Sequence, residues 1–162
     1  QVLNQRLGEL SYKVYGDEVP PDATITLRIS DGVIAPYEYN GTLAPGNTTY
    51  FGMYDRFYSF DQETYPWGLP DKWKNPPDDF DLSTPLNFAS TNDIVGGNSG
   101  SSMINRSAEV IGLVFDGNME SLPGKFIFLP ESNRAIAVDS RGLMEALKKI
   151  YKADRLVEEL KN

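Results

Sequence analysis

The sequence contains no histidine and no cysteine among its 162 residues. Without cysteine, the chain cannot form disulfides, a cysteine-ligated zinc site or a thiolate nucleophile. Without histidine, it lacks the commonest metal ligand and also the usual general base of a serine hydrolase. We therefore predict no metal site and no cofactor.

Basic charge is also scarce, and long apolar runs are missing. Fifteen basic residues against twenty-three acidic ones give a net charge of −8, and no lysine or arginine cluster stands out. This balance argues against nucleic acid as a partner. No apolar run approaches the roughly 20 residues of a membrane span. The sequence opens at Gln1 inside a predicted helix and shows no signal peptide, so we expect it to be cut from a longer protein.

Both ends of the chain predict helices. The apolar stripe of residues 2–15 is typical of an amphipathic helix, which the Pro20-Pro21 pair helps to end. We interpret residues 1–16 as the tail of a preceding helical region, with an ordinary packed terminal helix as the alternative. Residues 17–162 are predicted to form one β-barrel with a closing helix. Asp139 or Ser140 would cap that helix, and its apolar stripe comprises Leu143, Leu147 and Ile150, then Leu156 and Leu160 after a break at Asp154.

Short strands separated by turn signals fill the middle of the chain. Alternation over residues 23–29, then Asp31-Gly32 and the apolar run 33–35, predicts a hairpin. Residues 55–85 are rich in aromatics and prolines and predict a long surface excursion that covers the barrel, with a helical turn near 71–74. Further strands are predicted over residues 48–54, 85–90, 110–115, 125–129 and 134–138. The fold class predicted is mainly β, a small closed barrel.

One serine is packed between glycines, in the run Gly96-Gly97-Asn98-Ser99-Gly100-Ser101. The glycines allow a sharp turn and leave amide groups free to face an oxyanion. A strand follows over residues 110–115, as in chymotrypsin-like hydrolases. A serine needs a base to accept its proton, and no lysine stands at a spacing that suggests one. The chain is therefore either the nucleophile-bearing half of a two-barrel protease or a protease-like fold without catalysis.

Three stretches together resemble the S46 family of dipeptidyl peptidases: residues 92–101, 109–118 and 134–141. The resemblance covers residues 85–160 well and the predicted hairpin at 23–35 loosely. It implies a chymotrypsin-like (trypsin-like) double barrel with an inserted helical domain. It also implies a His-Asp-Ser triad in which the histidine and aspartate precede the insertion. This chain would then be the C-terminal barrel, inactive in isolation.

The resemblance also implies roles for individual residues. Ser99 is the nucleophile that forms an acyl-enzyme, and the amides of Gly97 and Ser99 form the oxyanion hole. Phe115 and Gly117 lie along the S1 pocket. Gly117 stands where acid-specific members carry arginine, which implies an apolar P1 residue. Asp116 binds the substrate's α-ammonium group, with a simple strand end as the alternative. Asp93 is interpreted as structural and not as an acid that selects lysine or arginine.

Partners and location follow from the same resemblance. Substrates would be peptides with a free N-terminus, and the missing N-terminal barrel and helical domain would complete the site. The location would be the periplasm or cell surface of a Gram-negative bacterium, and a homodimer is left open. One alternative is a glutamyl-endopeptidase-like protease, although residues 111–117 lack the histidine that reads an acidic P1. A non-catalytic peptide-binding module is the other.

Overall fold

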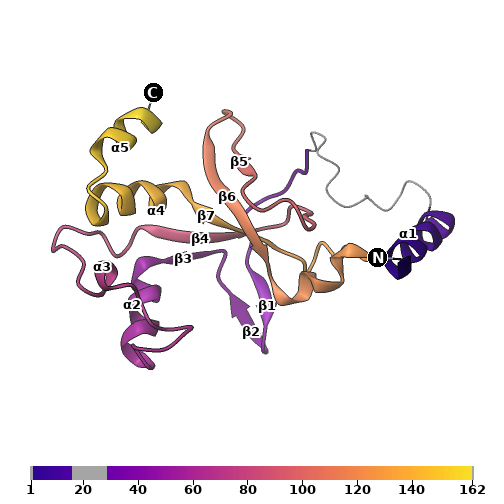
Figure 1. The fold of residues 1–162 in the computed structure, drawn as a ribbon, viewed down its shortest axis with the longest axis horizontal. Coiled ribbons are helices and arrows are strands. Elements are labelled where there is room, and N and C mark those ends of the chain that lie inside the picture. Colours follow the sequence, from indigo (N-terminus) through magenta and orange to yellow (C-terminus); the bar gives the residue numbers. More distant parts are fainter. Residues whose placement is uncertain (1, 16–28, 162) are drawn as a thin grey trace.

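The computed structural model describes residues 2–15 and 29–161. Its centre is a five-stranded antiparallel sheet with the strand order β3-β4-β7-β6-β5 (Figure 1). The mainly β fold is confirmed, and the described strands form a partial barrel. Closure of the barrel stays a prediction, because the strand predicted over residues 23–29 lies almost wholly outside the described residues. The strands are β3 (Asn47–Thr49), β4 (Pro85–Ser90), β5 (Ser102–Ile104), β6 (Val110–Gly117) and β7 (Ala135–Asp139).

Three of these strands, β4, β6 and β7, confirm the predictions over residues 85–90, 110–115 and 134–138. They enclose a small core in which Phe88, Val114 and Ala137 are buried. Gly112 on β6 lies directly against this core, because a Cβ there would stand 2.6 Å from Phe88 Cε1 and 2.5 Å from the Val138 carbonyl oxygen. The absence of a side chain at 112 therefore lets the strands and the phenylalanine ring approach each other.

A second, smaller sheet is the hairpin of β1 (Tyr37–Tyr39) and β2 (Thr42–Ala44). Its turn residues Asn40 and Gly41 both have positive φ, 50° and 72°, the conformation that favours Asn-Gly in two-residue hairpins. This hairpin was not predicted, although Asn40-Gly41 is a strong sequence signal for it. The strand predicted over residues 23–29 falls outside the described residues except for Ile29, so that hairpin stays a prediction.

The strand predicted over residues 48–54 is wrong beyond Thr49. Helix α2 (Tyr50–Ser59) begins there instead. Tyr50, Tyr54 and Phe57 recur at helical spacing, and all three are buried. These residues have the period of a helix and not of a strand.

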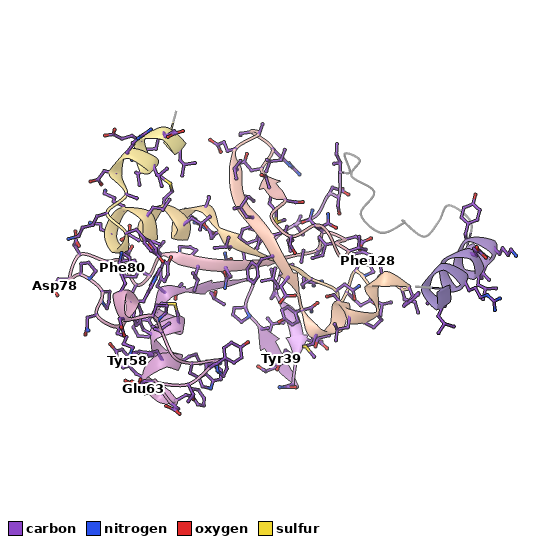
Figure 2. All side chains as sticks on the ribbon, viewed as in Figure 1. Tyr39, Tyr58, Glu63, Asp78, Phe80 and Phe128 are labelled. Atoms are coloured by element: carbon purple, nitrogen blue, oxygen red, sulfur yellow. The ribbon has the colours of Figure 1, made fainter. Side chains whose placement is uncertain are left out.

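The predicted excursion at residues 55–85 is wrong over 55–59, which belong to α2, and its remaining residues pack on α2 in a second core. Its helical turn α3 (Asp71–Lys74) is confirmed, and Phe80 packs with Tyr50 and Tyr54 of α2. Phe80 lies on the opposite side of the molecule from Phe128 (Figure 2).

Two tyrosine hydroxyls donate inside this core, from Tyr50 to the Gly142 carbonyl and from Tyr54 to the Trp73 carbonyl. Burial raises the pKa of both tyrosines to about 12.

The strand predicted over residues 125–129 is wrong. The 3-10 helix η2 (Met119–Lys125) precedes it, and the amides of Phe126 and Ile127 both donate to the Pro123 carbonyl. These amides are used in a turn and are not available to a strand ladder. Phe126, Ile127 and Leu129 are 53%, 59% and 42% exposed, so no alternating face is buried.

The closing helix is confirmed in part. Asp139 caps α4 (Ser140–Glu145) by accepting from the Arg141 amide at 2.9 Å. A π-helical turn η3 (Ala146–Ile150) follows, and α5 (Asp154–Lys161) starts at the predicted break. The predicted apolar stripe is wrong in α5, because Leu156 and Leu160 are exposed and Val157 is the buried residue.

Helix α1 (Val2–Tyr15) confirms the predicted N-terminal helix. It lies apart from the sheet (Figure 1), and all of its apolar stripe is exposed: Leu3, Leu7, Leu10 and Val14. Whether this helix is the tail of a preceding helical region or an ordinary terminal helix stays a prediction. The division of the chain at residue 16 stays a prediction.

Replacing Gly112 by alanine should destabilise the chain. The methyl group would overlap Phe88 and the β7 backbone, and overpacking of this kind costs about 1–3 kcal/mol. Gly52→Ala is the matched control, because Gly52 lies in α2 with no atom within 4 Å of the added Cβ. That variant should gain up to about 1 kcal/mol from helix propensity. Urea unfolding measures both, and equal effects would contradict the close packing at Gly112.

Candidate active site

The glycine-rich turn around Ser99 is held by its own backbone and by Asn98. Gly97 and Gly100 have φ of 100° and 88°. Residues other than glycine adopt this conformation only at a cost in free energy. The Asn98 amide donates to the Val95 carbonyl, and the Asn98 side chain accepts from the Val95 amide at 2.9 Å. The Asn98 side chain thus closes the turn that displays Ser99.

Two backbone hydrogen bonds fasten this turn to β6. The Gly100 amide donates to the Val114 carbonyl at 2.7 Å, and the Val114 amide donates to the Ser101 carbonyl at 3.0 Å. The residues that follow Val114 on β6 are therefore held beside Ser99. A β-bulge between Val114 and Asp116 shifts the register against β7 at this point.

A cavity of about 590 Å³ lies beside Ser99 and contains most of the predicted site. Phe115, Asp116 and Gly117 line it together with Ser99, so the structure brings these four residues together. Gly97 lies two residues before Ser99 but does not line the cavity. The remaining lining residues are Ile94, Val95, Gly96, Asn98, Val114, Asn118, Ser121 and Leu122.

The hydrogen bonds of the turn leave several groups available. Within the described part of the chain, the amides of Gly97 and Ser99 donate to no acceptor, and the exposed Ser99 hydroxyl has no partner. Asp116 Oδ1 accepts from the Gly117 amide at 2.8 Å, and its other oxygen is bonded to no described residue. Asp116 is the sole ionisable residue among the described lining residues. Apart from Asp116, the described lining therefore offers Ser99 no side-chain base.

Asp93 does not line this cavity. Its amide donates to the Ser30 hydroxyl at 2.9 Å, and burial raises the pKa of its carboxyl group. Desolvation without a cation favours the neutral acid. An acid placed in this way is consistent with the structural interpretation of Asp93, although the role of this residue stays a prediction.

Asn118 and Arg134 support the cavity wall, and no role was predicted for either residue. Asn118 is buried, donates from its side chain to the Ser132 carbonyl and accepts from the Arg134 amide, both at 2.8 Å. Its own amide donates to the Arg134 carbonyl. These bonds fix the end of β6 directly after Asp116 and Gly117. Asn118 stood in the motif 109–118 that carries the family resemblance, which was a signal available for it.

The Arg134 guanidinium is buried with backbone acceptors around it. It donates to the carbonyls of Pro36, Pro130 and Asn133 at 2.9, 2.9 and 2.7 Å. A buried cation needs such acceptors because it has lost its hydration. Arg134 thereby ties the segment before β1 to the segment before β7. Arg134 opens the stretch 134–141 that carries the family resemblance, but its backbone partners could not be predicted from that stretch.

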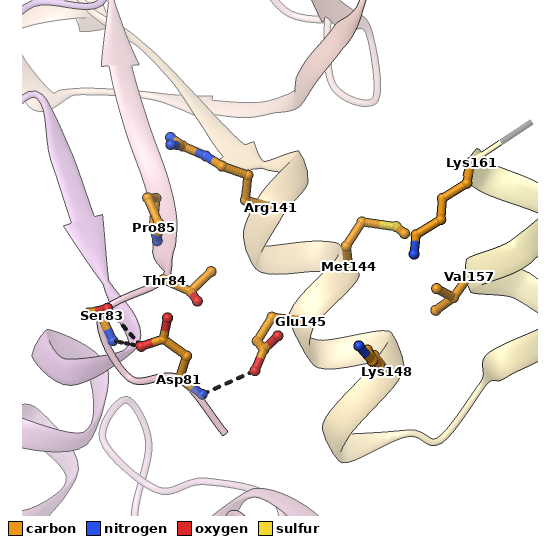
Figure 3. A pocket seen from close by; sticks show the side chains of 10 residues that line it. All are labelled: Asp81, Ser83, Thr84, Pro85, Arg141, Met144, Glu145, Lys148, Val157 and Lys161. Atoms are coloured by element: carbon orange, nitrogen blue, oxygen red, sulfur yellow. Dashed lines mark hydrogen bonds between the residues drawn. The ribbon is translucent and has the colours of Figure 1, made fainter. Parts of the chain in front are cut away.

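A second cavity, of about 480 Å³, lies where α4 and α5 face the segment before β4 (Figure 3). Several of its polar groups are already paired with neighbours. Asp81 accepts from the Ser83 hydroxyl and amide, its own amide donates to Glu145, and Arg141 forms an ion pair with Asp139. These bonds hold the elements together and do not converge on the cavity.

The described residues contain no cluster of three or more potential ligands that could hold a metal ion. Within the same residues, no helix has both the length and the apolar character to cross a membrane.

The sequence matches the Peptidase S46 family over residues 2–162. The chain belongs to the S46 peptidase family. This S46 chain is 33% identical to dipeptidyl-peptidase 7 of Porphyromonas gingivalis, over 90% of its own length and 21% of the relative's. It is 30% identical to the Asp/Glu-specific dipeptidyl-peptidase of Shewanella putrefaciens, over 92% of its length and 24% of the relative's.

Solved structures give the same result. The crystal structure of Porphyromonas endodontalis DPP11 with the dipeptide Arg-Glu superposes with a TM-score of 0.76 and 29% identity, over 93% of this chain and 22% of that one. The S46 resemblance is thus confirmed. The chain spans about a fifth of the length of the relatives it matches.

Replacing Asn118 by alanine should destabilise the cavity wall. The Arg134 amide and the Ser132 carbonyl would lose their partners, and a buried unpaired group costs about 1–3 kcal/mol. The control is Asn105→Ala, since Asn105 also makes several side-chain hydrogen bonds but in an exposed turn where water can replace them. Urea unfolding should give a clearly larger loss for Asn118→Ala, and losses of equal size would contradict the supporting role.

Proposed function

We propose that this chain carries the nucleophile of a serine-type dipeptidyl peptidase. The observation that carries the proposal is the cavity that gathers Ser99, Phe115, Asp116 and Gly117 in a chain of the S46 family. Ser99 attacks the carbonyl carbon of the scissile peptide bond, and the acyl-enzyme that results is hydrolysed by water. The proton of Ser99 passes to a histidine outside this sequence, because the sequence has none.

The oxyanion of this reaction is stabilised by backbone amides. The amides of Gly97 and Ser99 are the candidates, and both are without an acceptor among the described residues. The positive φ of Gly97 helps to shape the turn that carries them. Amides that are held in place before the reaction stabilise the developing charge without having to reorganise.

Asp116 selects the free N-terminus of the substrate. One oxygen of its carboxylate is fixed by the Gly117 amide, which leaves the other for the α-ammonium group of a peptide. A charge-assisted hydrogen bond in a sheltered cavity is strong and directional. Peptides would therefore be cut at a fixed distance from their first residue, and dipeptides would be released.

The cavity suits an apolar residue at P1. Its described lining contains no lysine or arginine, so an acidic P1 side chain would lose hydration without gaining a cation. The wall at Gly117 is bare backbone. Relatives include both dipeptidyl-peptidase 7 and Asp/Glu-specific dipeptidyl-peptidases, and this lining favours a preference for apolar P1 residues.

The rest of the enzyme lies outside this sequence under the same proposal. An N-terminal barrel would bring the histidine and aspartate of the triad, and a helical domain would precede α1, whose apolar stripe is exposed. The isolated chain would then be inactive. We place the full-length protein in the periplasm or at the cell surface of a Gram-negative bacterium, and a homodimer is left open.

Replacing Ser99 by alanine in the full-length protein should abolish dipeptide release. Loss of the nucleophile of a triad lowers kcat by roughly 10³-fold or more. Ser107→Ala is the control, because Ser107 lies in an exposed turn and its hydroxyl is bonded to no described residue. Turnover and fluorophosphonate labelling are measured together. Undiminished turnover and labelling in Ser99→Ala would refute the proposal.

Replacing Asp116 by asparagine should weaken catalysis on peptides with a free amine. The loss of one charge-assisted contact corresponds to about 10–150-fold in kcat/KM. Asp78→Asn is the control and should be unchanged, because Asp78 is an exposed acid that does not line the cavity. Substrates with a free and with an acetylated N-terminus are compared. Efficient cleavage of the acetylated peptide by the wild type would point to an endopeptidase instead.

A further inference from the structure

A neighbouring side chain, and not the backbone conformation of Gly117, leaves no room for a larger residue at position 117. Its φ lies outside the left-handed region that favours glycine. A Cβ at this position would stand 2.3 Å from the Ser121 hydroxyl oxygen and 3.4 Å from Ser121 Cβ. The hydroxyl of Ser121 therefore occupies the space that any side chain at 117 would need.

The Ser121 hydroxyl is fixed in this position by the first turn of η2. It donates to the Asn118 carbonyl at 2.6 Å, and the Ser121 amide donates to the same carbonyl. Asn118 is itself buried and bonded to Ser132 and Arg134. To make room for a larger residue at 117, the hydroxyl would have to rotate and break its bond.

Ser121 also faces the cavity. It lines the wall with Gly117, Leu122 and Ser99, so its side chain limits the space beside the serine. Under the proposed function, on which this inference rests, that space receives the P1 side chain of the substrate. A methylene more or less in such a pocket changes kcat/KM by about 10–200-fold.

We propose that Ser121 is a specificity-determining residue, whose hydroxyl keeps the wall at Gly117 bare and limits the size of the P1 side chain. Two consequences follow from the steric overlap. Removing the Ser121 side chain enlarges the pocket and admits bulkier P1 residues. It also relieves the cost of a side chain at 117, so the effects of changing the two positions are coupled.

The test is a double-mutant cycle in the full-length protein. The variants are Gly117→Ala, Ser121→Gly and the combination of both, with Ser107→Gly as a control for replacing an exposed serine. Dipeptidyl substrates that differ only in P1, with alanine, leucine or phenylalanine, give kcat/KM, and thermal unfolding gives Tm. Ser121→Gly should raise the phenylalanine-to-alanine ratio of kcat/KM about tenfold.

The pair should also be non-additive. Gly117→Ala should lower Tm and lower kcat/KM for phenylalanine at P1, and it should cost much less in the Ser121→Gly background. Additive Tm shifts, or an unchanged P1 ratio in Ser121→Gly while the wild type is active, would overturn the inference alone. A full-length wild type that releases no dipeptide would overturn the proposed function and the inference with it.

Discussion

The hydrogen bonds between the Ser99 turn and β6 are the contact on which the site depends. The Gly100 amide and the Ser101 carbonyl both bond to Val114, which joins a loop to a strand of the central sheet. Strand β6 makes its longest pairing with β7, so the turn is attached to a well-paired strand in the centre of the sheet. Ser99 and Asp116 are 17 residues apart in sequence. Without these bonds, their positions relative to each other would not be fixed.

The wall of the cavity depends on buried polar groups as well as on apolar packing. Asn118 and Arg134 are buried and bonded mainly to backbone carbonyls and amides. Such groups are directional, so they set the position of a segment more sharply than apolar contacts do. The aromatic core around Tyr50 and Phe80 is a separate cluster. Aromatic packing therefore builds the second core, whereas hydrogen bonds add to apolar packing beside the site.

The sequence was sufficient where local rules and tertiary packing agree. The glycine-flanked serine, the apolar run of β6 and the Asp139 cap each carry a local signal, and the fold follows them. The sequence was insufficient where one residue type fits two structures, as with the aromatic residues of α2. It was also insufficient over residues 125–129, where the Pro123 carbonyl accepts the amides that a strand would have used. The partners of Asn118, Arg134 and Ser121 are set by tertiary contacts, which no pattern of period or spacing reveals.

The β-bulge at Phe115 decides which side of the sheet carries a charge. Strict alternation would place Asp116 on the same face as the buried Gly112 and Val114. Val114 pairs with Ala137, but Asp116 pairs with Ile136 and not with the buried Ala135, because Phe115 is left unpaired in the ladder. The alternation of side chains between the two faces of the sheet is thus reversed for the last two residues of β6, Asp116 and Gly117. A single extra residue converts a position that would bury a carboxylate into one that presents it to the cavity beside Ser99.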